Sequence, residues 1–467
     1  MFIGREEEME LLQDLYASNK FEFLVLYGRR RVGKTSLLRE FTKDKKAIYF
    51  SCQEKNDSLN LSDFSSIVQS HFEGSSYGDF SNWQSAFAYI SDKSAQERTL
   101  LVIDEFPYVA LENPSIKSIL QHTIDHSWKE RNIFLVLCGS SVSFMESEVL
   151  GFKSPLYGRA TAKLELKGFD YYLSSKFFPE YSNEEKLLAY GILGGIPSYL
   201  EQFDGSKPII SNLASCILRT GSFLKDEPQT LLKMEVRDPG VYNSILETIA
   251  EGSSRMSVIA DKIHEETQKC SKYLSTLQTI KIVEKIVPAG ESDKTKKSIY
   301  RICDNFFQFW YRFPFRNKSH YEIIGAKAAA DEILDADTIS TYMGSIFERI
   351  CYEYMLRMAK TSQLPIAPYH IGRWWGANPT TRKQDDVDIL VLGKNRDEAI
   401  FCECKYRNVL FDKSEFDDLL TASKAFPETK TKFYYLFSKS GFSQWVHEEA
   451  EKREDVKLVG LDDLFAF

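Results

Sequence analysis

The stretch FEFLVLYGRRRVGKTSLL, residues 21–38, decides the fold of the N-terminal part of the chain. A β-prone apolar run leads into a loop bounded by glycines, and a Lys-Thr pair opens a segment with helical spacing. Strand, glycine loop and helix in this order form a P-loop, in which backbone N–H groups and the lysine face phosphates and the threonine hydroxyl faces Mg²⁺. The stretch therefore predicts an ATP and Mg²⁺ site made by Gly28, Arg31, Gly33, Lys34, Thr35 and Ser36.

A second apolar run, residues 100–103, ends in Asp104 and Glu105. A strand buried on both faces delivers its polar end to the carboxyl edge of a parallel sheet, where ligands bind. We expect Asp104 to join the Mg²⁺ shell and Glu105 to polarise the attacking water. A hydroxyl of Ser140 or Ser141, after the run at 133–137, is expected to sense the γ phosphate. Arg159 is expected to stabilise phosphoryl charge, either in cis or across a subunit interface.

Several flanking motifs accompany the loop: FIGREEE at 2–8, LVIDEF at 101–106, LYGRAT at 156–161 and GGIPSYL at 194–200. Together with YGRRRVGKT they resemble the archaeal-type ATPases of the STAND class, which is related to the AAA+ group. The resemblance covers roughly residues 1–235. It implies that Gly4, Arg5 and Glu6 contact the adenine end, and that Gly195 and Pro197 in a helical lid touch the nucleotide. It also implies slow cycling and homo-oligomer assembly when ATP is bound.

The pattern from about residue 241 predicts a winged helix-turn-helix: helices over 242–250, 256–264 and 270–280, then strands over 282–287 and 298–302 around a polar loop at 290–297. If this module contacts DNA, Lys269, Lys272 and the loop lysines face it. Alternatively, the module only holds the lid in place. The aromatic block at 304–315 is expected to pack between modules rather than to stack on bases.

The C-terminal part carries a second group of candidate catalytic residues. A helix over 344–357 places Glu348 near its start, a strand over 385–392 begins with acids, and a hairpin partner over 399–405 alternates Glu403 and Lys405 onto one face. Asp388 and Glu403 can share Mg²⁺, Lys405 can orient water, and Glu348 can complete the shell. Asp386 lies on the same face as Asp388, so either could be the metal-binding acid. Asp388 is favoured because it adjoins the apolar stretch.

This helix Glu, strand Asp and ExK pattern resembles the PD-(D/E)xK nuclease fold. The whole region, including IGRWWGANP at 371–379, is similar to an uncharacterised domain that is commonly fused to these ATPases. The resemblance implies a metal-dependent phosphodiesterase, and whether cleavage is retained stays open.

Composition limits the partners. The 467-residue chain is 43% hydrophobic and has no apolar run of the roughly 20 residues needed to cross a bilayer. Its N-terminus lacks the pattern of a signal peptide, so we expect a cytoplasmic protein without a membrane partner. The net charge of −8 means that any contact with nucleic acid must be local. Candidate patches are residues 29–31, residues 294–297, and a group made of Arg373, Arg382, Lys383, Lys405 and Arg407. The eight cysteines are scattered, as expected for free thiols.

The sequence thus predicts an α/β chain with a P-loop ATPase domain at 1–165, a helical lid at 166–235, a winged helix at 236–315 and a nuclease-like domain at 316–467. The first functional hypothesis is an ATP-controlled metal-dependent nuclease acting on nucleic acid, with DNA favoured over RNA. The alternative is a regulatory scaffold whose C-terminal fold binds nucleic acid or a partner without cutting it. Retention of DNA without cleavage would distinguish the second from the first.

Overall fold

The computed structural model describes residues 2–95, 97–292 and 294–467, so Met1 of the predicted ATPase domain and Asp293 of the predicted wing loop lie outside the described residues. The chain divides into two compact units. The first comprises residues 1–168 with 196–198 and 279–281, and the second comprises the remaining segments from 169 to 467. The boundary at 168 lies close to the predicted end of the ATPase domain. The further divisions at 235 and 315 stay predictions.

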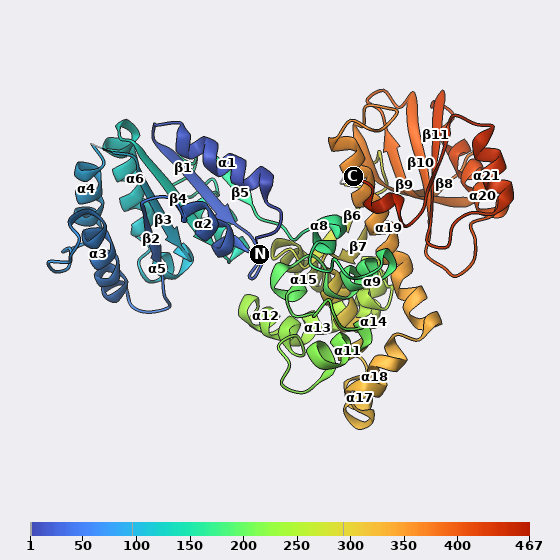
Figure 1. Ribbon diagram of the computed structural model, residues 1–467, viewed down its shortest axis with the longest axis horizontal. Coiled ribbons are helices and arrows are strands. Elements are labelled where there is room, and N and C mark those ends of the chain that lie inside the picture. Colours follow the sequence, from blue (N-terminus) through green and yellow to red (C-terminus); the bar gives the residue numbers. More distant parts are fainter. Residues whose placement is uncertain (1, 96, 293) are drawn as a thin grey trace. The chain divides into compact units, whose positions relative to one another are not determined.

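The first unit is built on a five-stranded parallel sheet with the strand order β2-β3-β4-β1-β5 (Figure 1). Strands β3 and β4 are buried along their whole length, as expected for parallel strands covered on both faces. The predicted parallel α/β sheet is therefore confirmed, and β5 is an addition that the sequence did not predict. The strands are β1 (Glu22–Tyr27), β2 (Ala47–Ser51), β3 (Thr99–Asp104), β4 (Ile133–Gly139) and β5 (Ala162–Glu165).

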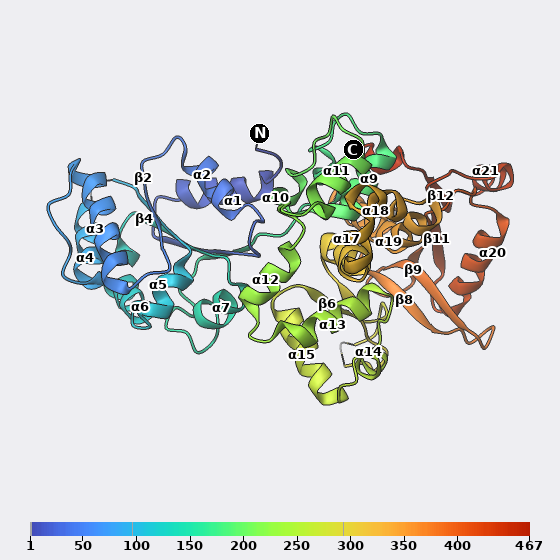
Figure 2. The same ribbon diagram turned by 90° about the horizontal axis from the view of Figure 1, so that it is seen from below.

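Helices cover both faces of this sheet (Figure 2). On one face Phe41 of α2 packs edge-on against Phe134 of β4, with ring centroids 6.2 Å apart. On the other face Phe64 of α3 and Trp83 of α4 surround Phe50 of β2. The helices are α1 (Glu6–Ala17), α2 (Lys34–Thr42), α3 (Asp57–Glu73), α4 (Trp83–Lys93), α5 (Phe106–Glu112), α6 (Ile116–His126), η1 (Trp128–Glu130), α7 (Val142–Phe144) and η2 (Met145–Val149).

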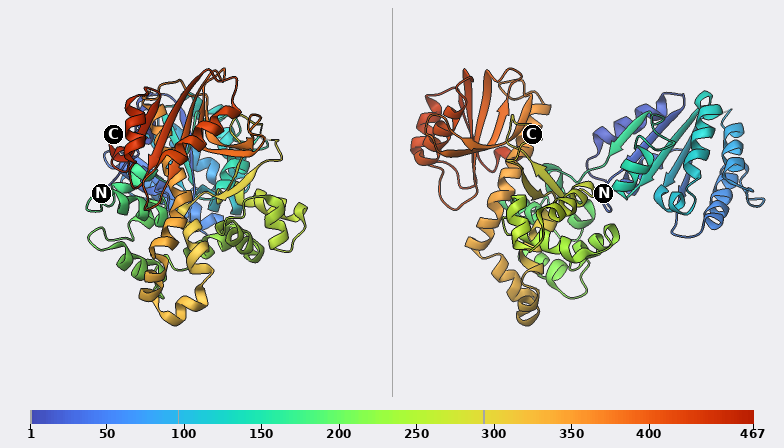
Figure 3. Two further views of the ribbon diagram at one scale, coloured as in Figure 1. Left: turned by 90° about the vertical axis from the view of Figure 1, so that its right-hand side faces the viewer. Right: turned by 180° about the vertical axis from the view of Figure 1, so that it is seen from behind.

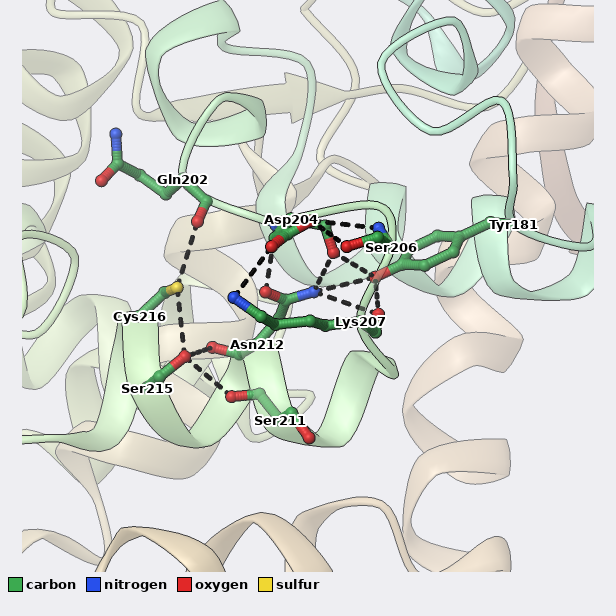
Figure 4. A network of polar contacts seen from close by, with 9 residues as sticks. All are labelled: Tyr181, Gln202, Asp204, Ser206, Lys207, Ser211, Asn212, Ser215 and Cys216. Atoms are coloured by element: carbon green, nitrogen blue, oxygen red, sulfur yellow. Dashed lines mark hydrogen bonds and ion pairs between the residues drawn. The ribbon is translucent and has the colours of Figure 1, made fainter.

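The segment predicted as a lid is helical. Asn212 holds it together: its buried amide donates to the Tyr181 hydroxyl at 2.9 Å and to the Asp204 carbonyl at 2.8 Å (Figure 4). The elements are α8 (Tyr171–Ser175), α9 (Asn183–Leu193), α10 (Pro197–Leu200), α11 (Ile209–Asn212), η3 (Leu213–Leu218) and α12 (Glu227–Glu235).

Three helices and an antiparallel hairpin follow, in the predicted order: α13 (Pro239–Ala250), α14 (Met256–Lys262), α15 (Thr267–Thr279), β6 (Val283–Ile286) and β7 (Ile299–Ile302). The aromatic block forms α16 (Asn305–Trp310) and η4 (Tyr311–Phe315). Phe306, Phe307 and Phe309 are fully buried there. The block therefore serves packing, as the sequence indicated.

The C-terminal sheet is mixed, in the order β12-β11-β10-β9-β8 (Figure 3). Strands β8 to β10 pair antiparallel and β10 to β12 pair parallel. Helix α19 packs on one face through buried Phe347 and Cys351, and α20 packs on the other through Phe416. The elements are α17 (Lys318–Ile324), α18 (Ala326–Ile333), α19 (Ala336–Lys360), β8 (His370–Ala377), β9 (Gln384–Leu392), β10 (Glu398–Lys405), α20 (Lys413–Ala422), η5 (Ser423–Ala425), β11 (Thr431–Ser438), α21 (Gln444–Glu451), β12 (Val456–Val459) and η6 (Asp463–Phe465).

Two further observations concern the whole described chain. Among residues 2–95, 97–292 and 294–467, none of the helices combines the length and the apolar character needed to span a membrane. All eight cysteines are free thiols, as predicted.

Candidate active sites

The P-loop connects the end of β1 to the start of α2. Gly28 has a φ of 152°, and a Cβ there would lie 2.3 Å from the Leu166 carbonyl oxygen. Gly33 has a φ of 97°, in the region that favours glycine. Arg31 takes a φ of 68° between them. The loop therefore needs both glycines for its shape, and it delivers Thr35 and Ser36 into the first turn of α2.

Lys34 points back into this loop. Its ammonium group donates to the carbonyls of Gly28 at 2.9 Å and Arg29 at 3.0 Å. The side chain is only 5% exposed, and burial lowers its pKa. The lysine ammonium is thus held within the loop by two backbone carbonyls.

Asp104 lies opposite the start of α2. Its carboxylate accepts from the Thr35 hydroxyl at 3.1 Å and from the Tyr49 hydroxyl at 2.8 Å, and it is 2% exposed. Burial and then the Asp104 charge raise the pKa of Tyr49. The Thr35 and Asp104 oxygens are the hard donors that Mg²⁺ prefers, so this pair fits the predicted ion. Tyr49 was not predicted, and its only sequence signal is its place on the strand next to β3.

Glu105 follows directly after β3. Its backbone takes a left-handed φ of 52°, and its carboxylate accepts from the Ser140 N–H at 3.1 Å and the Ser140 hydroxyl at 2.7 Å. Ser140 therefore holds Glu105 at the carboxyl edge of the sheet, beside Asp104. The predicted sensing of a γ phosphate by Ser140 stays a prediction.

The N-terminal motif contacts the P-loop from outside. Gly4 and Arg5 both adopt positive φ, at 64° and 74°. The Arg5 guanidinium, 7% exposed, donates to the carbonyls of Val32 at 3.1 Å and Lys167 at 2.7 Å. Arg5 thus supports the loop through its backbone, and an adenine contact by this motif stays a prediction.

The GxP element also requires its residue types. A Cβ on Gly195 would lie 1.9 Å from the Phe169 carbonyl oxygen, so only glycine fits. The Pro197 ring lies 3.8 Å from where a Cβ on Gly33 would be. Pro197 is therefore next to the P-loop, as a nucleotide-contacting residue would have to be.

Arg159 lies at the other end of the sheet. It precedes β5, and Thr161 donates to the Phe23 carbonyl at the start of β1, so Arg159 is roughly 15–20 Å from the P-loop. Its guanidinium donates to Asp125 at 2.6 and 3.0 Å and holds the pKa of that carboxyl low, at about 2. Action of Arg159 on a nucleotide in cis would require this ion pair to break, and it stays a prediction. Action across a subunit interface stays a prediction.

A second site lies at the ends of β9 and β10. The Asp388 carboxylate accepts from the Cys404 N–H at 2.9 Å, and Lys405 forms an ion pair with Glu403. The Asp388 side chain is 10% exposed, whereas that of Asp386 is 56% exposed. Asp388 is therefore the acid nearer the sheet interior, as the preference between the two required.

Glu348 lies in the middle of the 25-residue helix α19, so its predicted place near a helix start is wrong. The helix continues N-terminally because residues 336–343 have no breaker and contribute buried Tyr342 and Met343. Glu348 accepts from Arg373 at 3.0 Å, and Arg373 also donates to Asp386 at 2.9 Å and lies 4.0 Å from Asp388. Carboxylates of the same chain thus pair with Arg373 in this structure, and its assignment to a nucleic-acid patch stays a prediction.

We call Glu348, Asp386, Asp388 and Glu403 the carboxylate cluster. Burial raises the pKa values of Glu348 and Glu403, and the charge of Asp388 raises them further. Burial also raises the pKa of Asp388. Three of these acids are half-buried and Asp386 is exposed. Neighbouring cations stabilise the charged form of such a group of acids, and carboxylate oxygens suit Mg²⁺. Within the described residues, no three acidic, His or Cys side chains are arranged to hold a metal ion.

Other predicted basic contacts are also paired. Arg407 forms an ion pair with Glu415, and Lys297 forms one with Glu291. Lys269 lies 3.5 Å from Glu265. These pairs are partly exposed and individually weak, so they do not prevent binding to phosphates.

Glu353, one turn beyond Glu348, was not predicted as a site residue. It accepts from the Tyr171 N–H at 2.9 Å and the Tyr190 hydroxyl at 2.7 Å, and it thereby joins α19 to α8 and α9. Burial raises its pKa to about 7. Because the folded pKa lies above the unfolded value, its protonation stabilises the fold at low pH, and this contribution is lost as the pH rises through 7.

We expect wild type to lose roughly 2 kcal/mol more stability between pH 5.5 and 8 than a Glu353→Gln variant, which keeps the acceptor but does not ionise. Urea unfolding at both pH values measures the difference. Glu451→Gln, on the exposed side of α21, is the control and should behave like wild type. Equal pH dependence of Glu353→Gln and wild type would contradict the prediction.

Comparisons with known proteins support the ATPase domain. A family model described as an ATPase domain predominantly from Archaea matches residues 2–203. An uncharacterised protein of Methanocaldococcus jannaschii is 32% identical over 470 residues, which cover 99% of this chain and 100% of the relative. The chain belongs to the family of archaeal-type ATPases. The ATPase match of this family member includes the P-loop, Asp104, Glu105 and Pro197.

This archaeal-type ATPase is also similar to a second protein family, to a further relative and to a solved structure. A family model described as archaeal and bacterial proteins of unknown function matches residues 310–419, which include Glu348, Asp388, Glu403 and Lys405. An uncharacterised ATP-binding protein of Pyrococcus horikoshii is 28% identical over 43% of this chain and 73% of its own length. The structure of a Walker-type ATPase of Pyrococcus abyssi aligns with 67% of this chain and 96% of its own, with a TM-score of 0.47 and 22% identity.

Proposed function

We propose that this archaeal-type ATPase is an ATP-binding and ATP-hydrolysing switch that controls a C-terminal metal-dependent nuclease module acting on DNA or RNA. The observation that carries the proposal is helix α19. It bears Glu348 of the carboxylate cluster, and further contacts of the same helix reach the helical lid: Arg357 to Asp170 at 2.9 Å, and Tyr342 to the Gly191 carbonyl at 2.6 Å. Because α19 contacts the lid and also carries Glu348, a shift of the lid could be transmitted through this helix to the carboxylate cluster.

At the P-loop, Lys34 and the backbone N–H groups would bind the phosphates, with Arg31 and Ser36 beside them. Thr35 and Asp104 would hold Mg²⁺, which neutralises phosphate charge when bound. Glu105, held by Ser140, is placed to orient and polarise the water. STAND-class behaviour, with assembly in the ATP state and Arg159 acting across an interface, belongs to this proposal.

At the cluster, Asp388 and Glu403 would hold the divalent ion, which supplies charge stabilisation at the scissile phosphate. Lys405 is placed to orient water, since its ammonium is already held by Glu403. Glu348 would complete the shell or act through a water. The order helix α19, strands β8 to β10, helix α20 and parallel strand β11 supports the PD-(D/E)xK resemblance of the ExK pattern.

The segment α13 to β7 is proposed as a winged helix-turn-helix, because three helices precede an antiparallel hairpin. Lys269 and Lys272 lie on its third helix and are exposed, as a DNA-facing surface requires. A cytoplasmic location is part of the same proposal.

Lys34→Ala tests the switch. Removal of the buried ammonium should weaken ATP binding about 30-fold or more by isothermal titration, since charge-assisted hydrogen bonds to phosphate are lost. Cleavage of DNA by wild type should differ between the ATP, ADP and nucleotide-free states, and Lys34→Ala should show the nucleotide-free rate in all three. Lys43→Ala, exposed just beyond α2, is the matched control. Equal cleavage rates of wild type in the ATP, ADP and nucleotide-free states would contradict the proposed switch.

One observation favours the alternative, a regulatory scaffold with an inactive nuclease fold: Arg373 already neutralises the cluster. In that case the ATP state changes oligomer size or DNA retention while no phosphodiester bond breaks. Size-exclusion chromatography and DNA retention, run beside the cleavage assay, distinguish the two.

A further inference from the structure

Arg373 has an unusual position among the carboxylates. Its two terminal nitrogens bond different acids, Nη1 to Glu348 at 3.0 Å and Nη2 to Asp386 at 2.9 Å, and Nη2 lies 4.0 Å from Asp388. One side chain thus forms ion pairs with an acid on α19 and an acid on β9. A divalent cation held by Asp388 and Glu403 would repel this guanidinium, which lies 4.0 Å from Asp388. Arginine and metal would also compete for Glu348.

The backbone explains why an arginine on β8 reaches this place. The pairing of β8 with β9 shifts register between Gly372 and Trp374, whose partners are Leu390 and Val387. Two residues of β9, Asp388 and Ile389, therefore lie opposite Arg373 alone, and the bulge is on β9. A bulge releases a residue from strict alternation and re-aims its side chain. The Ala289 N–H donates to the Arg373 carbonyl at 2.8 Å, so the segment after β6 holds the backbone of Arg373 opposite the bulge. The position of Arg373 is therefore built into the fold.

The contact between Arg373 and Asp386 is accessible to water. Its side chain is 37% exposed and Asp386 is 56% exposed, so the outer bond faces water, where an ion pair contributes little. The guanidinium fork that binds two carboxylate groups also matches two oxygens of a phosphate.

We propose that Arg373 is an exchangeable occupant of the metal place: it offsets part of the negative charge of the carboxylate cluster in the metal-free protein and, once a divalent cation replaces it, binds a backbone phosphate of the nucleic acid. This inference rests on the proposed nuclease function. It adds to that function a substrate-binding residue and a reason why the acids do not form a ready metal site.

The test titrates nucleotide-free protein with Mn²⁺ and, separately, measures retention of a short DNA duplex in Ca²⁺. The Arg373→Gln variant should bind Mn²⁺ roughly tenfold more tightly, because it lacks the positive guanidinium that lies 4.0 Å from Asp388 and repels the cation. It should retain DNA roughly tenfold more weakly, because the phosphate contact is gone. Arg373→Lys should keep near wild-type Mn²⁺ affinity but only part of the DNA retention, since it keeps charge and loses the fork.

Lys457→Gln is the matched control, since it removes one positive charge from exposed β12 at the opposite edge of the sheet. Asp388→Asn identifies the Mn²⁺ bound at the cluster. Unchanged or weaker Mn²⁺ binding by Arg373→Gln, with binding lost in Asp388→Asn, would overturn the role of Arg373 and leave the proposed nuclease site standing. Absence of cluster Mn²⁺ in both wild type and Arg373→Gln would overturn both. Mn²⁺ bound by Arg373→Gln alone would support the occupant role and argue against a working nuclease.

Discussion

A Glu105→Gln variant is expected to bind ATP with wild-type affinity and to hydrolyse it at least roughly 100-fold more slowly. The glutamine keeps the size of the side chain and still accepts from the Ser140 N–H and hydroxyl, so the loop geometry is preserved. It has no carboxylate charge with which to polarise a water. Isothermal titration measures the affinity, and release of inorganic phosphate at saturating ATP measures the rate.

Glu112→Gln is the control for this experiment, because Glu112 is exposed at the far end of α5 and the same change there should leave both quantities unaltered. Ser140→Ala should give a smaller loss, since the carboxylate remains but loses one donor. If Glu105→Gln turned over like wild type, the water-polarising role would belong to another residue.

The N-terminal site was predictable because its signals are local. Gly28, Gly33 and Lys34 lie within seven residues, and the strand that ends at Asp104 is one unbroken apolar run. In such a motif the spacing along the chain sets the spacing in space, so residue types and positions can be assigned together. The same holds for the order of elements in the three-helix segment, where helical periodicity and a polar loop are readable without tertiary information.

The contacts between the candidate catalytic residues were harder to predict from the sequence. Arg373 lies opposite a β-bulge formed by Asp388 and Ile389 of β9, and no composition signal marks a bulge within this apolar strand. Tyr49 meets Asp104 because β2 and β3 are neighbours, which depends on the strand order and not on sequence separation. Arg159 was expected near phosphate from its residue type alone, whereas the parallel direction of β5 puts it at the amino end of the sheet. Each case depends on long-range pairing.

At the second site, an Asp388→Asn variant is expected to lose divalent-dependent cleavage by roughly 1,000-fold, the rate ratio of about 4 kcal/mol. The asparagine oxygen can still accept from the Cys404 N–H, so the junction of β9 and β10 stays intact. The change removes a charged oxygen ligand from Asp388, which is less exposed than Asp386. A neutral amide binds a hard cation far more weakly than a carboxylate does. Lys405→Ala should also reduce cleavage, through loss of the ammonium that orients water.

The assay incubates wild type and variants with Mg²⁺ or Mn²⁺ and with single- and double-stranded DNA and RNA. Asp418→Asn is the matched control, since it makes the same change on the exposed side of α20 and should cleave like wild type. Equal cleavage by wild type, Asp388→Asn and Lys405→Ala would place the activity outside this cluster. Absence of cleavage on every substrate would reject catalysis and leave the scaffold alternative. Because the Asp418 and Asp388 variants differ only in where one charge is lost, a selective loss at Asp388 would tie the chemistry to the ends of β9 and β10.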